Sequence, residues 1–284
     1  TYDGDIGKLR SGFVEFLHNL PFYGLAVVCA DDPGVQTIMG SIGRAIVTYG
    51  LDEGADLRAE NIEFDAGRTR FDVVRGGDRP ALQITLRLPG LHNVRNALAA
   101  IAVADELQVS DDAVVKALEN FEGIDRRFQS LGEIHTAAGK IMLIDDYGHH
   151  PTEVAATIAA ARTGWPEKRV VLVFQPHRYT RTRDLMDDFA QVLSEVDVLV
   201  LLDVYAAGEA PIAGADGRAI ARAVRSRGAV EPVFVESLED LQPVLADILE
   251  DGDLVLTMGA GDIGAYAAKL PQLLAGKPTL KVHS

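Results

Sequence analysis

The chain has 284 residues, of which 48% are hydrophobic and 24% charged, a composition typical of a globular protein with one large domain or two ordinary ones. Its net charge of −15 argues against nucleic acid or an anionic membrane as the main partner. Cys29 is the single cysteine, so no internal disulfide can form, and we expect it to be a small core residue. No apolar run reaches the roughly 18–20 residues of a membrane span. We therefore expect a cytoplasmic protein.

The first part of the chain predicts a mixed α/β domain. Apolar residues recur at helical spacing near the start, and three later β-type runs separated by glycine-containing turns predict an antiparallel meander. Ser110 is the expected cap of the last helix. In chain order we expect a helix at 5–17, a strand at 24–30, a helix at 35–42, strands at 45–49, 55–64, 70–74 and 81–88, and helices at 92–107 and 111–121.

Beyond Gly123 the pattern changes to regular strand–helix alternation, which predicts a doubly wound, mostly parallel, Rossmann-like sheet. We therefore expect two domains, at 1–122 and 123–284. The expected strands lie at 128–135, 140–144, 170–174, 198–203, 232–235 and 254–257. The expected helices lie at 151–162, 183–194, 216–226, 238–249 and 262–273.

Polar residues cluster just past the apolar strands of this second domain. The carboxyl ends of parallel strands meet at one edge of a sheet, where ligands bind in open α/β folds, so we expect these clusters to converge. The clusters are Asp145-Asp-Tyr-Gly-His-His150, Gln175-Pro-His-Arg-Tyr-Thr-Arg-Thr-Arg183, Asp203-Val-Tyr-Ala-Ala-Gly-Glu209 and Gly259-Ala-Gly-Asp-Ile-Gly264.

Three arginines, Arg178, Arg181 and Arg183, crowd the expected start of a helix in an acidic protein. Cations are unfavourable at a helix N-terminus, so we expect a phosphate or carboxylate there as compensating anion. Surface pairing of these arginines with neighbouring aspartates is the alternative.

Two asparagines in the first domain, Asn93 and Asn96, are three residues apart and so share one face of the expected helix. Their amides can both donate and accept, which suits contact with the edge of a nucleotide base. The alternative is that Asn93 only caps its helix.

The cluster after residue 144 carries two carboxylates and two imidazoles. An exposed carboxylate of Asp145 or Asp146 suits a Mg²⁺-bound phosphate or a ribose hydroxyl, while the other supports the turn. Either His149 or His150 could instead cap the helix that follows. Adjacent histidines on a rigid turn do not form a zinc pair, and we expect no metal ligands in this chain.

The glycines of Gly259-x-Gly-x-x-Gly264 match a dinucleotide fingerprint. They lie on the last strand, which weakens an interpretation as an NAD-dependent dehydrogenase. A glycine turn that only allows helix packing is the alternative.

Several segments together resemble the Mur ligases of bacterial cell-wall synthesis, and within them the branch that joins L-alanine to UDP-N-acetylmuramate. The segments are Phe13–Gly24, Leu88-Pro-Gly-x-His-Asn-x-x-Asn96, Arg126-Arg-Phe128, Asp145-Asp-Tyr-Gly-His-His-Pro-Thr-Glu153, Phe174–Arg183 and Gly259–Gly264. The resemblance covers essentially the whole chain and implies the later part of an ATP-binding domain followed by the C-terminal ligase domain.

This resemblance also implies site residues. ATP, with Mg²⁺ held mainly by other segments, would contact His92, Asn93, Asn96, Arg127 and Asp146. Substrate groups would contact Tyr147, His149, His177, Arg178, Arg181, Gly259, Ala260 and Gly261, and catalysis would involve Asp146, His149, Arg178 and Arg181. The implied reaction forms an acyl phosphate on UDP-N-acetylmuramate, which the amine of L-alanine attacks, in a monomer or homodimer.

The chain departs from the family in lacking a Gly-x-x-Gly-Lys-Thr phosphate loop, because its Gly-Lys pairs at residues 7, 139 and 276 continue with Leu, Ile and Pro. It also starts at Thr1. We therefore expect a truncated ligase, with an incomplete first domain and no activity alone. A non-catalytic nucleotide- or anion-binding module is the other interpretation.

Overall fold

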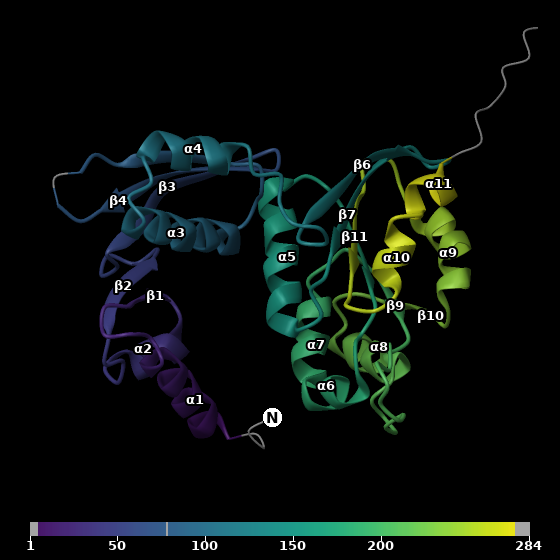
Figure 1. Cartoon of the computed structure of the whole chain (residues 1–284). Helices are drawn as coiled ribbons and strands as arrows, with labels where there is room; N and C mark the ends of the chain where they lie inside the picture. Colours follow the sequence, from purple (N-terminus) through teal and green to yellow (C-terminus); the bar gives the residue numbers. More distant parts are fainter. Residues whose placement is uncertain (1–4, 78, 276–284) are drawn as a thin grey trace, which may run out of the picture. The chain divides into compact units, whose positions relative to one another are not determined.

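The computed structural model describes residues 5–77 and 79–275 (Figure 1). The chain divides into two compact units, residues 1–122 and 123–284, and each is described by itself. In the described residues, no helix has both the length and the apolar character needed to cross a bilayer.

The first unit holds a mixed sheet in the order β1-β2-β3-β4-β5. Strands β1, β2 and β3 are parallel, and β3 to β5 form the predicted antiparallel meander. Helices α3 and α4 bury apolar side chains against the meander. The elements are α1 (Ile6–His18), β1 (Leu25–Cys29), α2 (Pro33–Met39), β2 (Ala45–Gly50), β3 (Leu57–Asp65), β4 (Arg68–Arg75), β5 (Leu82–Leu86), α3 (Leu91–Glu106) and α4 (Asp111–Glu119).

The amino-terminal end of this unit has little closed core. No residue of α1 is buried, and Phe13 and Phe16 on that helix are 56% and 69% exposed. Cys29 is half-buried and lines a cavity of about 540 Å³ bordered by α1, β1 and α2, so the expectation of a closed-core cysteine is wrong. Ser110 does precede α4, but its side chain makes no capping hydrogen bond.

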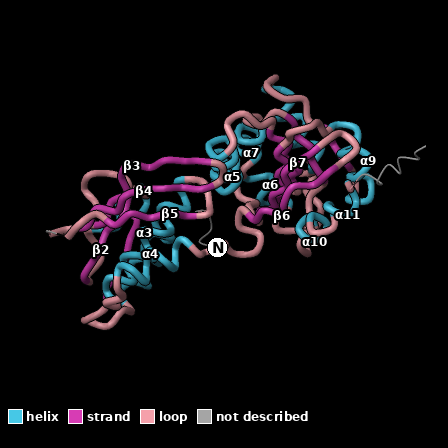
Figure 2. The backbone as a smooth tube through the Cα atoms, turned by 90° about the horizontal axis from the view of Figure 1, so that it is seen from above, coloured by secondary structure: helices cyan, strands magenta, loops and turns pink. Residues whose placement is uncertain are grey.

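The second unit is the predicted doubly wound sheet, in the order β10-β9-β8-β11-β7-β6, and among its strands within residues 123–275 only β6 is antiparallel. Helices α5, α7 and α8 pack on one face and α9, α10 and α11 on the other (Figures 1 and 2). The strands are β6 (Gln129–His135), β7 (Lys140–Asp146), β8 (Val170–Phe174), β9 (Val198–Leu202), β10 (Val233–Val235) and β11 (Leu254–Met258). The helices are α5 (Pro151–Gly164), α6 (Tyr179–Asp184), α7 (Met186–Leu193), α8 (Gly217–Arg227), the 3₁₀ helix η2 (Leu238–Asp240), α9 (Leu241–Ile248), α10 (Ile263–Ala267) and α11 (Leu270–Leu274).

Three helices that the sequence predicted as continuous are broken. The region expected at 183–194 begins earlier and divides at Leu185, whose φ of −120° leaves the helical region. The region expected at 262–273 restarts at α11, where Pro271 has no N–H to continue the helical ladder. Pro243 likewise lies in the first turn of α9, after η2.

Candidate functional site

The polar turns of the second unit converge at the carboxyl edge of its sheet. Met258 at the end of β11 lies in register with Asp146 on one side and Phe174 on the other, and Phe174 pairs with Leu201 of β9. The turns that follow these strands are therefore neighbours although they are far apart in sequence. This arrangement is the convergence that the strand-end clusters predicted.

A row of four rings crosses this edge. The ring centroids of Tyr147 and His149 are 5.3 Å apart, those of His149 and His177 5.4 Å, and those of His177 and Tyr205 5.6 Å. The last pair is stacked, with an interplanar angle of 11°. Three of these residues were predicted site residues. Tyr205 was not, although its cluster had been noted, because spacing alone does not reveal a stacking partner on another strand.

Arg181 and His177 form a directional pair. A guanidinium nitrogen of Arg181 lies 3.0 Å from the His177 carbonyl oxygen and 3.2 Å from its Nδ1. Because guanidinium can only donate, Nδ1 must be the acceptor and His177 is neutral with its proton on Nε2. Burial and the nearby His149, Arg181 and Arg178 lower the pKa of His177, which keeps it neutral.

The two adjacent histidines have different roles in the structure. His150 is the N-cap of α5, and its side chain accepts from the Thr152 N–H while Glu153 accepts from the backbone N–H of His150. This is a capping box. His149 instead faces the ring row, with Nδ1 3.0 Å from the Tyr147 carbonyl oxygen and 3.5 Å from the Glu153 carboxylate. The capping alternative is therefore the structural role of His150 and not of His149.

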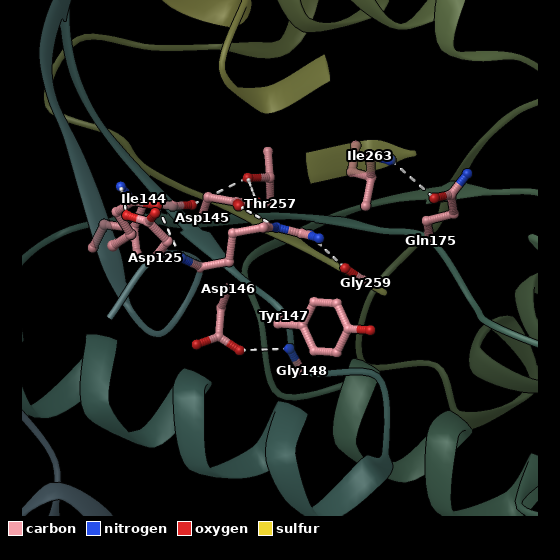
Figure 3. Close-up of polar contacts among 12 residues, drawn as sticks. Asp125, Ile144, Asp145, Asp146, Tyr147, Gly148, Gln175, Thr257, Gly259 and Ile263 are labelled. Atoms are coloured by element: carbon pink, nitrogen blue, oxygen red, sulfur yellow. Dashed lines mark hydrogen bonds and ion pairs between the residues drawn. The ribbon is translucent and has the colours of Figure 1, made fainter. Parts of the chain in front are cut away.

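Both aspartates are buried, at 3% and 6% exposure, so the expectation of an exposed carboxylate at Asp145 or Asp146 is wrong. Asp146 accepts from the Phe128 N–H at 2.8 Å. It also accepts from the Gly148 N–H at 2.7 Å (Figure 3). Burial raises its pKa, against the lowering effect of these two bonds. Asp146 therefore holds the turn after β7 to the segment before β6.

Asp145 binds Arg126, a residue that the sequence had not assigned a role. The Arg126 guanidinium contacts the Asp145 carboxylate at 2.8 Å and donates to the Gly259 carbonyl at 2.6 Å (Figure 3). It also lies 5.1 Å from the Tyr147 ring centroid. Thr257 donates to the other Asp145 oxygen at 2.8 Å. Arg126 thus ties the ends of β7 and β11 to the ring row.

The glycines of the β11 turn make room for the chain's own atoms. A Cβ at Gly259 would collide with the backbone of Gln175, one at Gly261 with the side chains of Gln175 and Tyr205, and one at Gly264 with the Arg126 guanidinium. The Gln175 side chain donates to Asp262 at 2.6 Å. It also accepts from the Ile263 N–H (Figure 3). Internal packing therefore accounts for the glycine spacing, and the spacing gives no support to a dinucleotide site. Ala260, between the first two of these glycines, is half-buried.

The arginine cluster lies differently from the prediction. Helix α6 starts after Arg178, so Arg181 and Arg183 lie in its last turn, where cations are favourable. Arg183 forms an exposed ion pair with Asp184, as the alternative of surface pairing predicted. Arg181 instead donates to the His177 carbonyl. The anion at the first turn of α6 is the chain's own Glu209, which accepts from the backbone N–H of Thr180. The argument that the cluster needs an external anion is therefore wrong as it was stated.

Arg127 has an exposed side chain, 5.6 Å from the Tyr147 ring centroid and 3.9 Å from Glu153. Its neighbours Arg126 and Phe128 have φ values of 58° and 49° in the left-handed region, which non-glycine residues seldom adopt. Such strained positions cluster at functional sites.

The predicted adenine contacts lie in the first unit, at the start of α3. Asn93 does not cap this helix: Gly90, with φ of 98°, holds the N-cap position, and the Asn93 side chain donates to the Pro89 carbonyl at 2.8 Å. Asn96 is exposed, and His92 is half-buried. Burial and the neighbouring Arg95 lower the pKa of His92. The amide oxygen of Asn93 accepts no hydrogen bond among those resolved in residues 5–77 and 79–275 and is available to a ligand.

The described residues gather no group of three His, Cys, Asp or Glu side chains that could hold a metal ion. Since Asp145 and Asp146 are committed to internal contacts, they do not fit a Mg²⁺ site in this arrangement.

Two models of known protein families match the chain. A family model described as the Mur ligase middle domain matches residues 4–104, and one described as the Mur ligase glutamate ligase domain matches residues 126–261. The solved UDP-N-acetylmuramate-alanine ligase MurC from Thermotoga maritima is 30% identical, with a TM-score of 0.75 over 95% of this chain and 55% of that chain.

More distant structures share the fold. MurF ligase from Thermotoga maritima in complex with ADP is 17% identical, with a TM-score of 0.72 over 95% of this chain and 58% of that one. Mycobacterium tuberculosis folylpolyglutamate synthase, complexed with ADP and AMPPCP, is 17% identical with a TM-score of 0.69 over 94% and 59%. The chain thus spans a little over half the length of these relatives. With the middle and the C-terminal domain both matched, the chain belongs to the Mur ligase family.

Proposed function

We propose that these two domains serve the ATP-dependent ligation of L-alanine to the carboxylate of UDP-N-acetylmuramate in the cytoplasm. The observation that carries this proposal is the row Tyr147–His149–His177 with Arg181 and Arg178 beside it, at the carboxyl edge of the second sheet. The likeness to MurC at 30% identity favours alanine as the amine, since the other named relatives are 17% identical.

The reaction has two steps. The γ-phosphoryl group of ATP passes to a carboxylate oxygen, which gives an acyl phosphate and ADP. The amine nitrogen of alanine then attacks the carbonyl carbon, a C–N bond forms, the C–O bond to phosphate breaks, and inorganic phosphate leaves.

The groups at the ring row suit the second step. Arg178 is 51% exposed in its side chain and can bind the negative charge of the phosphate or of the amino acid carboxylate. Arg181 keeps His177 neutral, so its Nε2–H can donate to the oxygen that becomes negative in the tetrahedral intermediate. His149 has its Nδ1 directed at a carbonyl, which leaves Nε2 free to accept the amine proton. The Tyr147 ring contacts this imidazole, and the guanidinium groups of Arg126 and Arg127 lie over the same ring in cation–π contacts.

In the first unit, the start of α3 supplies the proposed adenine contacts. His92 stays neutral through burial, and Asn93 and Asn96 offer amide donors and acceptors to a base edge. Arg127, whose side chain is exposed, is proposed as a further nucleotide contact.

ADP formation tests the proposal. The complete gene product, with any upstream coding sequence, would be assayed with ATP, Mg²⁺, UDP-N-acetylmuramate and one amine at a time: L-alanine, L-lysine, D-glutamate or the dipeptide D-alanyl-D-alanine. We expect ADP formation that depends on both the sugar nucleotide and L-alanine. Preference for another amine would overturn the alanine assignment, and no ADP formation with any amine would favour a non-catalytic module.

The 284-residue chain assayed alone is expected to show no turnover, because its sequence contains no Gly-x-x-Gly-Lys-Thr loop. Turnover near that of the complete protein would contradict this expectation. A fluorescence titration with NADH is expected to show no binding, which would remove the dehydrogenase interpretation.

A further inference from the structure

Helix α6 lacks a cap of its own. It begins after Arg178, whose φ of 72° lies in the left-handed region and whose side chain makes no capping hydrogen bond. The N–H groups of the first helical turn need acceptors, and Glu209, from another loop, supplies one to the Thr180 N–H. One carboxylate oxygen of Glu209 accepts from the Thr180 N–H at 3.0 Å and the other from the Thr180 hydroxyl at 2.7 Å.

The loop after β9 is shaped to deliver this carboxylate. Tyr205 forms a two-way backbone bridge across the edge, donating to the Pro176 carbonyl at 2.8 Å and accepting from the Arg178 N–H at 2.9 Å. The loop then reverses at Ala207 and Gly208, with φ of 50° and 85°, and the Glu209 N–H closes the turn on the Ala206 carbonyl at 3.0 Å. Successive positive φ values at the two central residues are the pattern of a type I′ turn.

The capped helix carries the arginine of the site. Arg181 is the third residue of α6, and its guanidinium contacts both His177 Nδ1 and the His177 carbonyl. Arg178, just before the helix, lies 3.9 Å from Glu209. The bridge and the cap therefore both act at the N-terminal end of the same short helix, where the chain adopts an unfavourable backbone conformation at Arg178.

We propose that Glu209 is a positioning residue, which caps α6 from the loop 203–209 and thereby holds Arg181 against His177 in the ligase site. This role rests on the proposed function for its use in catalysis, but the contact itself can be tested without turnover. This role also explains part of the Asp203–Glu209 cluster. In the site described above, Tyr205 was the one member of this cluster that belonged to the ring row.

The test is the pH titration of the His177 Cε1–H signal by NMR in the 284-residue protein and in two variants. Glu209→Gln keeps the cap, since an amide oxygen can accept from the Thr180 N–H and the amide nitrogen can donate to its hydroxyl. Glu209→Ala removes it. Glu231→Ala, which breaks an exposed pair with Arg225, is the matched control, and circular dichroism verifies folding of each variant.

The charged and titratable groups around His177 are His149, Arg181, Arg178 and Glu209, together with Tyr205, whose ring stacks on the imidazole. If α6 frays, Arg181 leaves and the pKa of His177 rises, because a cation that disfavours the protonated imidazole is lost. We therefore expect a rise in Glu209→Ala and none in Glu209→Gln or Glu231→Ala. If Glu209 acted only through its charge, both Glu209 variants would lower the pKa of His177, because a nearby anion favours the protonated imidazole. That result, or no rise in Glu209→Ala, would overturn the proposal.

The same variants in the complete ligase separate the two proposals. With ligation established, Glu209→Ala should reduce kcat/KM about 10-fold or more and Glu209→Gln should restore most of it. An alanine variant with full kcat/KM would show that the positioning does not serve the reaction. Absence of ligation by the parent protein would reject the proposed function and leave the NMR result unaffected.

Discussion

His149 and His177 face each other with ring centroids 5.4 Å apart, yet their partners require opposite tautomers. The Nδ1 of His149 lies against a carbonyl oxygen, which can only accept, so this nitrogen carries the proton. The Nδ1 of His177 lies against a guanidinium, which can only donate, so here the proton is on Nε2. Two neighbouring imidazoles thus present an acceptor and a donor at equivalent ring positions.

The tautomers can be observed directly. In a long-range ¹H–¹⁵N spectrum of the ¹⁵N-histidine-labelled protein near pH 8, we expect His149 to show the Nδ1–H pattern and His177 the Nε2–H pattern. Arg181→Ala should free the His177 ring and leave His149 unchanged. The same pattern for both residues in the parent protein would contradict the assignment and the division of roles that follows from it.

Acidification should destabilise the second unit through His177. Its pKa is lowered in the folded protein, whereas in the unfolded chain a histidine titrates near about 6.5. As the pH falls through the unfolded value, the unfolded state takes up a proton that the native state does not, so the free energy of unfolding decreases until the native pKa is reached.

Urea unfolding at several pH values tests this linkage. Trp165 is the only tryptophan and stacks on Phe128 at 6.1 Å, so its fluorescence reports on the second unit. The stability advantage of the parent over His177→Gln should shrink as the pH falls from about 7.5 to about 5.5. An advantage that grows on acidification would mean that the folded protein favours the imidazolium.

Arg181 and Arg183 lie on the same short helix but have different partners, which makes them a matched pair. In the complete ligase, Arg181→Ala should lower kcat/KM by about 10²-fold or more, because Arg181 orients His177 as the donor to the developing oxyanion, and loss of such a donor costs roughly 3 kcal/mol. Arg183→Ala removes only the exposed contact with Asp184 and should change kcat/KM less than about threefold. An equal loss of kcat/KM in the two variants would indicate that both substitutions damage α6, and it would argue against a specific role of Arg181.

Asp146→Asn should destabilise the second unit at pH 7. Each carboxylate oxygen accepts one backbone N–H, from Phe128 or Gly148, and an asparagine has only one oxygen for the two donors. A buried N–H left without an acceptor costs about 1–3 kcal/mol. Urea unfolding followed by Trp165 fluorescence measures the loss. A variant as stable as the parent would show that relief from burying the charge offsets the missing bond.

His150 should matter for stability and not for chemistry. His150→Ala removes the N-cap of α5 and is expected to cost about 0.5–2 kcal/mol, while His150→Asn should recover most of this because asparagine is a preferred cap. In the complete ligase, neither variant should reduce kcat/KM as His149→Gln does. A larger kinetic effect at His150 than at His149 would reverse the roles that the structure gives to these residues.

Much of the fold was readable from the sequence because it depends on local periodicity. The continuous apolar runs predicted the buried strands β7, β8, β9 and β11, and regular alternation with helices predicted that they run parallel. Parallel strands share one carboxyl edge, so the convergence of their polar turns followed without coordinates. Helix breaks at Leu185 and before Pro271 were missed, because apolar spacing continues across them.

Only the tertiary structure decided what each polar side chain does. The sequence shows Asp145-Asp146 and His149-His150 as pairs of identical residues, and the fold gives each member a different partner. Arg126, Gln175, Tyr205 and Glu209 had no assigned role, since their partners lie on other strands and no spacing rule connects them. A hydrogen bond depends on positions to within a few tenths of an ångström, which long-range packing sets, and local sequence preferences do not specify it.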